Sequence, residues 1–122
     1  MSMQRMRSGH AGEDYAAAFL AKRGYRILER NFKNILGEID IVADHKGTLC
    51  FIEVKTRTSD GFGSPFEAVT RPKQRKLARV AESYLKYKRM TGRKARFDVV
   101  AVMLGQEGCA SIQIVPDAFE IL

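Results

Sequence analysis

The sequence predicts an α/β domain in which helices flank a mixed central β-sheet, in the order α-β-β-β-α-β-β. Three observations predict this fold. Two segments, around residues 11–23 and 72–89, have helical composition or apolar spacing. Extended runs rich in β-branched residues lie before and after the second of them. That helix is also long enough to cross over to a parallel strand. The 122 residues should form a single domain, 1–122, with flexible ends at 1–8 and 116–122.

The first helix is predicted from Ala11 to Arg23. The segment is rich in alanine, and Gly24 follows it as a stop signal. Glu13 shares a helix face with the apolar residues Ala16, Ala17 and Leu20, which follow it by three, four and seven positions. It should therefore lie at the start of the buried stripe of this helix. An acid near a helix N-terminus is also favoured by the helix dipole. A first strand is predicted next, over Tyr25–Lys33.

The stretch Gly37–Arg57 predicts a β-hairpin with strands over Glu38–Ala43 and Leu49–Arg57 and a polar turn between them. Successive side chains of a strand point to opposite faces. In the first strand this gives one face to Glu38, Asp40 and Val42, and the other to Ile39 and Ile41. In the second strand it gives one face to Phe51, Glu53, Lys55 and Arg57, and the other to Cys50, Ile52 and Val54.

Asp40, Glu53 and Lys55 are unusual here, because both faces of the hairpin carry apolar residues and charged side chains are rarely buried without a partner. Two interpretations fit. The three groups could form a structural ion-pair cluster at the end of the sheet, or the carboxylates could share a cation. Paired carboxylates with a strand carbonyl and water suit Mg²⁺. A nearby Lys can then orient water or stabilise charge on a phosphate.

The main helix is predicted over Pro72–Arg89, with Thr70 as its N-cap. Before it, Thr58–Gly63 has loop composition and Ser64–Glu67 has the pattern of a helical capping box. The core stripe of the main helix consists of Leu77, Val80, Ala81, Tyr84 and Leu85. Gln74 lies one turn before this stripe, where its amide could reach the carboxylates or serve as a satisfied structural amide.

Two further strands are predicted over Phe97–Leu104 and Ser111–Val115, the second at an edge of the sheet. Asp98 interrupts the apolar pattern of the first. Asp98 could pair with Arg57 or Arg96 as a structural acid, or it could hold a residue of the carboxylate site in place. We favour the structural interpretation.

The net charge of +7 favours a polyanionic partner. The charge is concentrated, because the segment Arg71–Arg96 contains eleven Lys or Arg residues against a single acid, Glu82. A solvated basic face is one interpretation and phosphate contact is the other, and the size of the imbalance favours phosphate. The residues predicted to bind nucleic acid are Arg57, Lys73, Arg75, Lys76 and Arg79.

Several classes of protein do not fit this composition. The longest uncharged apolar run, Tyr15–Ala21, is too short to span a bilayer, and the basic N-terminus lacks the apolar core of a secretory signal. Cys50 and Cys109 give neither zinc-site spacing nor a disulfide framework. We therefore expect a cytoplasmic protein whose partner is a polyanion and not a membrane. No sequence feature fixes the oligomeric state, and a homodimer is compatible with it.

An Asp ending one strand and a Glu-x-Lys on the next, here Asp40 and Glu53-Val54-Lys55, resembles the signature of the PD-(D/E)XK nuclease superfamily. The Pro of that name is absent. The chain is more closely similar to the YraN-like family, small bacterial proteins that resemble archaeal Holliday-junction resolvases. Between about residues 9 and 103 the matching motifs are Gly12-Glu13, Gly24-Tyr25, Asn31, Gly37-Glu38-Ile39-Asp40, Phe51–Arg57, Lys73-Gln74 and Arg96–Val100.

The resemblance implies a restriction-endonuclease-like core and an endonuclease that needs Mg²⁺ or Mn²⁺ and acts on DNA, including branched recombination or repair intermediates. It implies that Asp40 and Glu53 hold the cation with help from Glu13, that Lys55 acts on water or phosphate, and that Gln74 assists. Two alternatives stay open. The chain could be a nucleic-acid-binding module that keeps the carboxylates without cutting, or a structural or protein-interaction domain.

Overall fold

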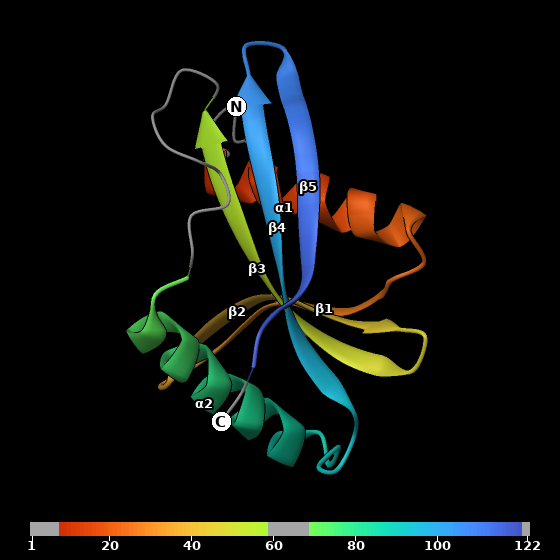
Figure 1. Ribbon diagram of the computed structural model, residues 1–122, viewed down its shortest axis with the longest axis vertical. Coiled ribbons are helices and arrows are strands. Elements are labelled where there is room, and N and C mark those ends of the chain that lie inside the picture. Colours follow the sequence, from red (N-terminus) through yellow and green to blue (C-terminus); the bar gives the residue numbers. More distant parts are fainter. Residues whose placement is uncertain (1–7, 59–68, 121–122) are drawn as a thin grey trace.

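The structure, a computed structural model, describes residues 8–58 and 69–120 (Figure 1). Its elements are α1 (Ser8–Lys22), β1 (Arg26–Asn34), β2 (Gly37–His45), β3 (Thr48–Thr58), α2 (Arg71–Tyr87), β4 (Ala95–Gly105) and β5 (Gly108–Phe119). The predicted fold class, a mixed α/β sheet flanked by two helices in this order, is confirmed. The capping box Ser64–Glu67, most of the loop Thr58–Gly63 and the predicted flexibility of the extreme ends lie outside the described residues.

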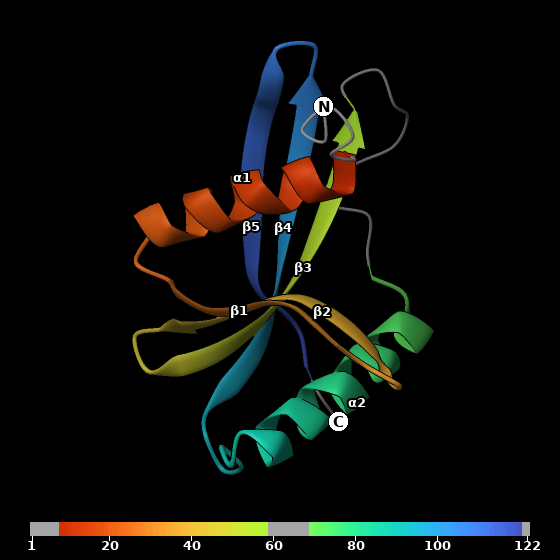
Figure 2. The ribbon, with the colours of Figure 1, turned by 180° about the vertical axis from the view of Figure 1, so that it is seen from behind.

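The five strands form one sheet in the order β1-β2-β3-β4-β5. β1, β2 and β3 form an antiparallel meander, and β3 pairs with β4 in parallel through the crossover that contains α2. β5 returns antiparallel at the edge, as predicted. The β1–β2 hairpin turns sharply away from the long strands β3 to β5, so the sheet is strongly twisted (Figures 1 and 2).

α1 packs across one face of the sheet, over β3 and β4 (Figure 2). Its buried residues Ala16 and Leu20 share a core cluster with Ile41, Ile52 and Val100. The helix ends as predicted: Gly24 has φ +90, and the next backbone N–H donates to the Leu20 carbonyl at 3.0 Å. It begins at Ser8, earlier than predicted, so Glu13 lies beyond the first turn and the helix dipole does not account for it.

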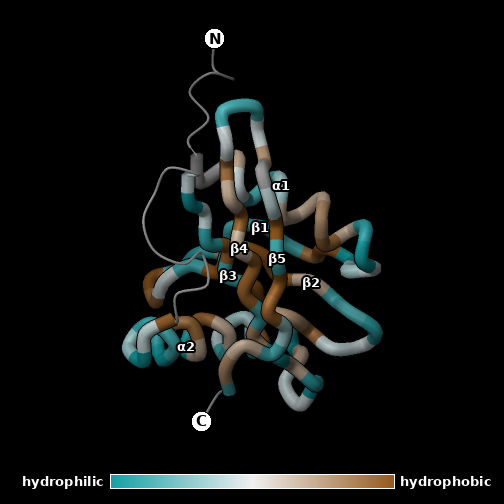
Figure 3. Tube along the Cα trace, turned by 45° about the horizontal axis from the view of Figure 1, so that its top comes forward, coloured by the Kyte–Doolittle hydropathy of each residue, from teal (hydrophilic) through white to brown (hydrophobic). Residues whose placement is uncertain are grey.

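α2 covers the other face. The Thr70 side chain accepts a hydrogen bond from the backbone N–H of Lys73, which confirms the predicted N-cap. Four of the five predicted stripe residues are buried, namely Leu77, Val80, Ala81 and Tyr84. They pack on the second core cluster, and the apolar path along the central strands is visible in Figure 3. Among the described residues, no helix has the length and apolar character needed to cross a membrane.

One sequence-based expectation is wrong, and one strand is longer than predicted. Ile39 and Ile41 do not share a face: Ile39 packs in the cluster under α2 and Ile41 in the cluster under α1. Regular alternation fails between them because β2 pairs with β3 only from Ile41 onward, and the part of β2 before Ile41 twists away from β3. The predicted last strand, Ser111–Val115, extends through residues 116–119. They complete β5, where the Asp117 N–H donates to the Asp98 carboxylate and Phe119 stacks on Phe97.

Candidate functional site

β2 and β3 separate at Asp40 and Glu53. Their pairing ends with Ile41 and Ile52, so the next pair of the register, Asp40 and Glu53, lies in the fork between the strands. There Asp40 Oδ2 accepts a hydrogen bond from the backbone N–H of Val54 at 2.7 Å. The Asp40 side chain thus takes the place of a ladder hydrogen bond and is held beside the strand that carries Glu53.

Three other carboxylates act on Asp40 at this fork. Burial raises the pKa of Asp40 to about 7, and the negative charges of Glu53 and, less strongly, Glu13 and Glu38 add to the shift. The backbone hydrogen bond to the same carboxylate opposes it. Asn31 links two of these acids, since its Nδ2 donates to Glu13 Oε1 at 2.8 Å and to Glu38 Oε2 at 3.3 Å. The fork therefore concentrates negative charge from α1, β2 and β3.

A cavity of about 290 Å³ opens beside the fork, between the β1–β2 hairpin, β3 and α2. Three acids, three lysines and three further residues line it: Lys33, Asn34, Gly37, Glu38, Asp40, Glu53, Lys73, Lys76 and Leu77. Lys73 Nζ lies 3.4 Å from Glu53 Oε2 and supplies that carboxylate with a counter-charge. The cavity wall is thus acidic at the fork and basic along α2.

The donor set at the fork fits a hard divalent cation. Asp40 and Glu53 present carboxylate oxygens to one cavity, and the charges of Glu13 and Glu38 strengthen the negative field. Within residues 8–58 and 69–120, no group of three or more His, Cys, Asp or Glu side chains forms a ready metal cage. Mg²⁺ is usually held by one or two carboxylates together with substrate phosphates, so two carboxylates beside basic side chains suit it.

Comparison with known proteins gives the family. The sequence model described as "Uncharacterised protein family UPF0102" matches residues 12–102. The chain belongs to the UPF0102 family. The predicted resemblance to the YraN-like family is thereby confirmed as membership of the UPF0102 family.

Relatives match this UPF0102 chain over nearly its whole length. A UPF0102 protein of Moorella thermoacetica is 51% identical over 120 residues, which cover 98% of this chain and 100% of the relative. One from Syntrophus aciditrophicus is 48% identical over 118 residues, covering 97% and 92%. One from Caldicellulosiruptor saccharolyticus is 44% identical over 118 residues, covering 96% and 100%.

Most of the site residues predicted for this UPF0102 chain gather around the fork. Asp40 and Glu53 line the same cavity. Glu13 acts on Asp40 from the α1 side. Lys55 follows Glu53 by two residues on β3, so it lies on the same side of that strand and is half-buried.

The basic residues predicted to bind nucleic acid are distributed along two elements. Lys73 and Lys76 line the cavity, whereas Arg75 and Arg79 are exposed on α2. Arg57 is half-buried at the end of β3, and its Nη1 donates to the Thr56 carbonyl at 2.9 Å. Lys73 and Lys76 thus lie beside the carboxylates, and the two arginines extend the basic surface outward.

Gln74 is placed differently from its predicted catalytic position. Its Nε2 donates to the Val69 carbonyl at 2.8 Å, and its backbone N–H donates to the Thr70 carbonyl. It is not among the residues that line the cavity. The amide is satisfied at the start of α2, which agrees with the structural alternative considered for it.

Sequence reasoning gave no role to Asn31 and Glu38, although both fall within the matching motifs. Asn31 has φ +55 inside a strand, a conformation that Asn tolerates better than most residues. This places its amide between Glu13 and Glu38. The sequence offered one signal for this role, namely an Asn at position 31 among the apolar and charged residues of the first predicted strand.

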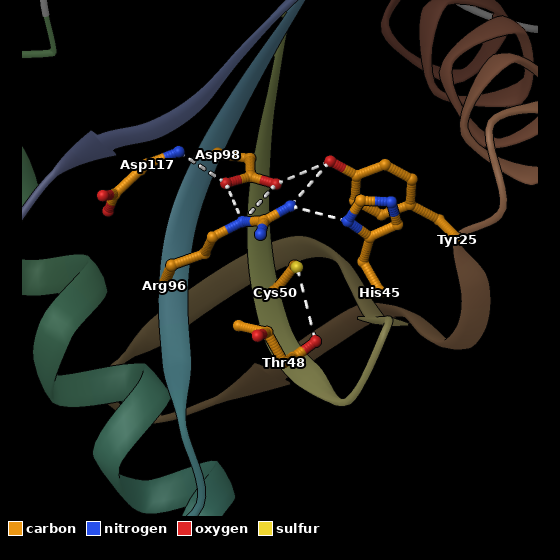
Figure 4. A network of polar contacts seen from close by, with 7 residues as sticks. All are labelled: Tyr25, His45, Thr48, Cys50, Arg96, Asp98 and Asp117. Carbon is orange, nitrogen blue, oxygen red and sulfur yellow. Dashed lines mark hydrogen bonds and ion pairs between the residues drawn. The ribbon is translucent and has the colours of Figure 1, made fainter.

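A second polar network lies between β4 and the start of β1 (Figure 4). Asp98 is fully buried, and it accepts hydrogen bonds from Arg96 Nε at 3.0 Å, from the Tyr25 hydroxyl at 3.1 Å and from the Asp117 N–H at 2.8 Å. Burial, followed by the charge of Asp98, raises the pKa of Tyr25 to about 12. The predicted pairing of Asp98 with Arg96 is confirmed, and its structural role agrees with the interpretation preferred from the sequence.

His45 completes this network from the end of β2. Arg96 Nη2 donates to the Tyr25 hydroxyl at 2.9 Å and lies 3.0 Å from His45 Nδ1 (Figure 4). Because a guanidinium can only donate, His45 Nδ1 must be the acceptor. The rings of Tyr25 and His45 stack at 4.1 Å. The network ties β2, β4 and β5 together below α1.

The raised pKa of Asp40 predicts that stability falls with pH when divalent cations are removed by EDTA. A carboxyl whose pKa is near 7 when folded and 3.8 when unfolded holds its proton more tightly in the native state. Its stabilising effect is complete below pH 4 and is lost as pH rises towards 7. Between pH 5 and pH 8 the free energy of unfolding should drop by about 3 kcal/mol from this group.

Urea unfolding of the wild type and of Asp40→Asn at both pH values measures this contribution. The variant lacks the titrating group, so it should be the more stable of the two at pH 8. Equal pH dependence in the two proteins would show that Asp40 titrates normally.

Proposed function

We propose that this chain is a DNA endonuclease that depends on Mg²⁺ or Mn²⁺. The observation that carries the proposal is the pair of carboxylates, Asp40 and Glu53, in a strand fork that faces the basic side chains of α2 in one cavity. A fork of this kind serves no evident purpose in stability, because it places like charges together and shifts the pKa of Asp40. The resemblance of the motif to PD-(D/E)XK nucleases supports the same reaction.

Each group has a role that follows from its position. Asp40 and Glu53 would hold the cation, with the Val54 carbonyl as a further oxygen donor, and Glu13 strengthens the negative field from the α1 side. A bound cation of this kind supplies Lewis acidity toward a phosphodiester and lowers the pKa of water. Lys55 orients water or stabilises charge on the phosphate. The Val54 N–H keeps the Asp40 carboxylate in place, so little reorganisation is needed.

Lys73 and Lys76 are placed to position the substrate. Both line the cavity that contains the carboxylates, and Lys73 contacts Glu53. A DNA phosphate that enters the cavity meets these ammonium groups on α2, and Arg75 and Arg79 extend the contact along the helix. Phosphate contacts of this kind fix register without reading sequence.

The test is a cleavage assay on single-stranded, duplex, flap and four-way DNA with Mn²⁺, with Mg²⁺ and with EDTA. Cleavage with either metal and none with EDTA is the expected result. A folded protein that binds DNA but cuts none of these substrates would instead favour the alternative, a nucleic-acid-binding module that retains the carboxylates.

DNA binding should be strongly salt-dependent and weakly selective for sequence. Each phosphate contact contributes about −0.9 to the slope of log affinity against log salt concentration on duplex DNA. Replacing Arg75 and Arg79 by Gln, which leaves the cavity residues intact, should flatten this slope by up to about 2. Fluorescence anisotropy across a salt series measures the slope.

Lys22→Gln is the matched control, because Lys22 is an exposed cation at the end of α1 and away from α2. It should leave the slope unchanged. If the two arginine substitutions also leave the slope unchanged, α2 is not the DNA-binding surface.

A further inference from the structure

The bend between β1 and β2 departs from ordinary turn chemistry. Its two central residues are Ile35 and Leu36, which are 99% and 41% exposed. Turns favour Gly, Asn, Asp, Pro and Ser. The β2–β3 and β4–β5 hairpins turn on the polar pairs Lys46-Gly47 and Gln106-Glu107, whereas the bend beside α2 is coloured as apolar in Figure 3. Local rules are broken in this way mainly at functional positions.

The bend is held rigidly on α2. Asn34 Oδ1 accepts from the Leu36 N–H at 2.9 Å, and Asn34 Nδ2 donates to Ser83 Oγ at 2.9 Å. Gly37 has φ +150, and a side chain there would meet a Val80 methyl group at 3.1 Å. The two apolar side chains are therefore presented to solvent from a fixed support.

The bend also belongs to the rim of the candidate site. Asn34 and Gly37, which flank it, line the cavity together with Lys33 and Lys76. Along β2, Leu36 is roughly 13 Å from Asp40 at the usual strand rise. Each strand of duplex DNA carries one phosphate per roughly 3.4 Å of helix axis, so this distance corresponds to at most about four nucleotides.

The apolar side chains of Ile35 and Leu36 lie close to Lys33 and Lys76. This combination matches nucleic acid, which has an anionic backbone and apolar faces between its stacked bases. A second copy of this chain fits less well, because each copy has a net charge of +7. Apolar side chains, Leu and Ile among them, unstack and kink DNA in many complexes when they insert between base steps. DNA is therefore the occupant that the charges around the bend favour.

We propose that Ile35 and Leu36 form a wedge that separates stacked bases up to about four nucleotides from the phosphate that enters the cavity at Asp40 and Glu53. This inference rests on the proposed function, because it assumes that DNA occupies the cavity. Unstacking is easiest where stacking is already interrupted. The wedge thus selects forks, flaps and nicks over continuous duplex.

The experiment uses forked and continuous duplexes that carry 2-aminopurine at successive positions, with Ca²⁺ in place of Mg²⁺ so that binding is measured without cutting. The test variant combines Ile35→Ser and Leu36→Asn, polar uncharged residues that are common in turns, and neither position has the positive φ that would require glycine. The matched control is Val115→Thr, which alters an exposed apolar residue on β5.

The wild type and Val115→Thr should increase 2-aminopurine fluorescence within a narrow window beside the junction. The double variant should lose that increase while its salt slope stays the same. Its preference for forked over continuous duplex should fall about tenfold, the change expected when an apolar side chain loses its buried contact.

Three results would overturn the wedge. The double variant could keep both the fluorescence increase and the fork preference, in which case the nuclease proposal stands without it. The bend could bind anionic lipid vesicles or a second copy of the chain while DNA binding is unaffected by the substitutions. Finally, a wild-type chain that neither binds nor cuts DNA would remove the wedge and the proposed function together.

Discussion

Asp40→Asn is expected to lower the rate of DNA cleavage by at least about a hundredfold, which corresponds to roughly 3 kcal/mol of transition-state stabilisation. The substitution keeps the size of the side chain and removes one of the two charges that would hold the cation. An Asn oxygen can still accept the hydrogen bond that Val54 N–H now donates to Asp40 at 2.7 Å, so the fork should persist. Single-turnover cleavage with saturating protein measures the chemical step.

Two controls separate chemistry from folding. The melting temperature of Asp40→Asn should be at least that of the wild type, because the raised pKa of Asp40 reports a carboxylate that is destabilised by its surroundings. Lys55→Ala should slow cleavage while cation binding stays largely intact. If Asp40→Asn cuts as fast as the wild type, the activity comes from another site or from a contaminant.

Asp98→Ala is expected to lower the free energy of unfolding by about 3–5 kcal/mol, a large part of the total stability of a domain of this size. Asp98 is fully buried and accepts hydrogen bonds from Arg96, Tyr25 and the Asp117 N–H. Alanine would leave the Arg96 charge without its counter-ion and three donors without an acceptor. Urea unfolding, monitored by circular dichroism, gives the difference.

Asp14→Ala is the matched control for this prediction. Asp14 also pairs with an arginine, Arg30, at 2.7 Å, but both side chains are well exposed. Exposed ion pairs contribute between about 0 and 1 kcal/mol, so this variant should unfold almost like the wild type. Equal losses in Asp14→Ala and Asp98→Ala would mean that burial of the Asp98 pair adds nothing to stability.

Sequence patterning predicted the elements and the main site pair, because these depend on local periodicity. The strand runs around Asp40 and Glu53 were separated by a polar turn, so antiparallel pairing was expected to bring the two acids together. The N-cap Thr70 and the stop at Gly24 also follow from local chemistry, and both are confirmed. These features require no knowledge of distant contacts.

The features that were missed depend on tertiary structure. Strand alternation assumes a regular strand, whereas β2 twists where it leaves β3, and this separates Ile39 from Ile41. Gln74 was expected near the carboxylates from its helical position, but its amide turns back to the Val69 carbonyl. The last strand was predicted to end at Val115, yet the Asp117 N–H donates to the carboxylate of buried Asp98 on the neighbouring strand β4.

The candidate site draws groups from all three layers of the domain, namely α1, the sheet and α2. The β2–β3 hairpin can bring Asp40 to Val54 by closing a short stretch of chain, but Glu13 and Lys73 arrive only when α1 and α2 dock on opposite faces. The unfolded chain therefore has no such concentration of charge, and the repulsion among the acids appears only with the finished fold. A cation that neutralises it recognises the native state alone. The concentration of the proposed cation is then linked by mass action to the population of folded molecules, so adding that cation should raise the free energy of unfolding.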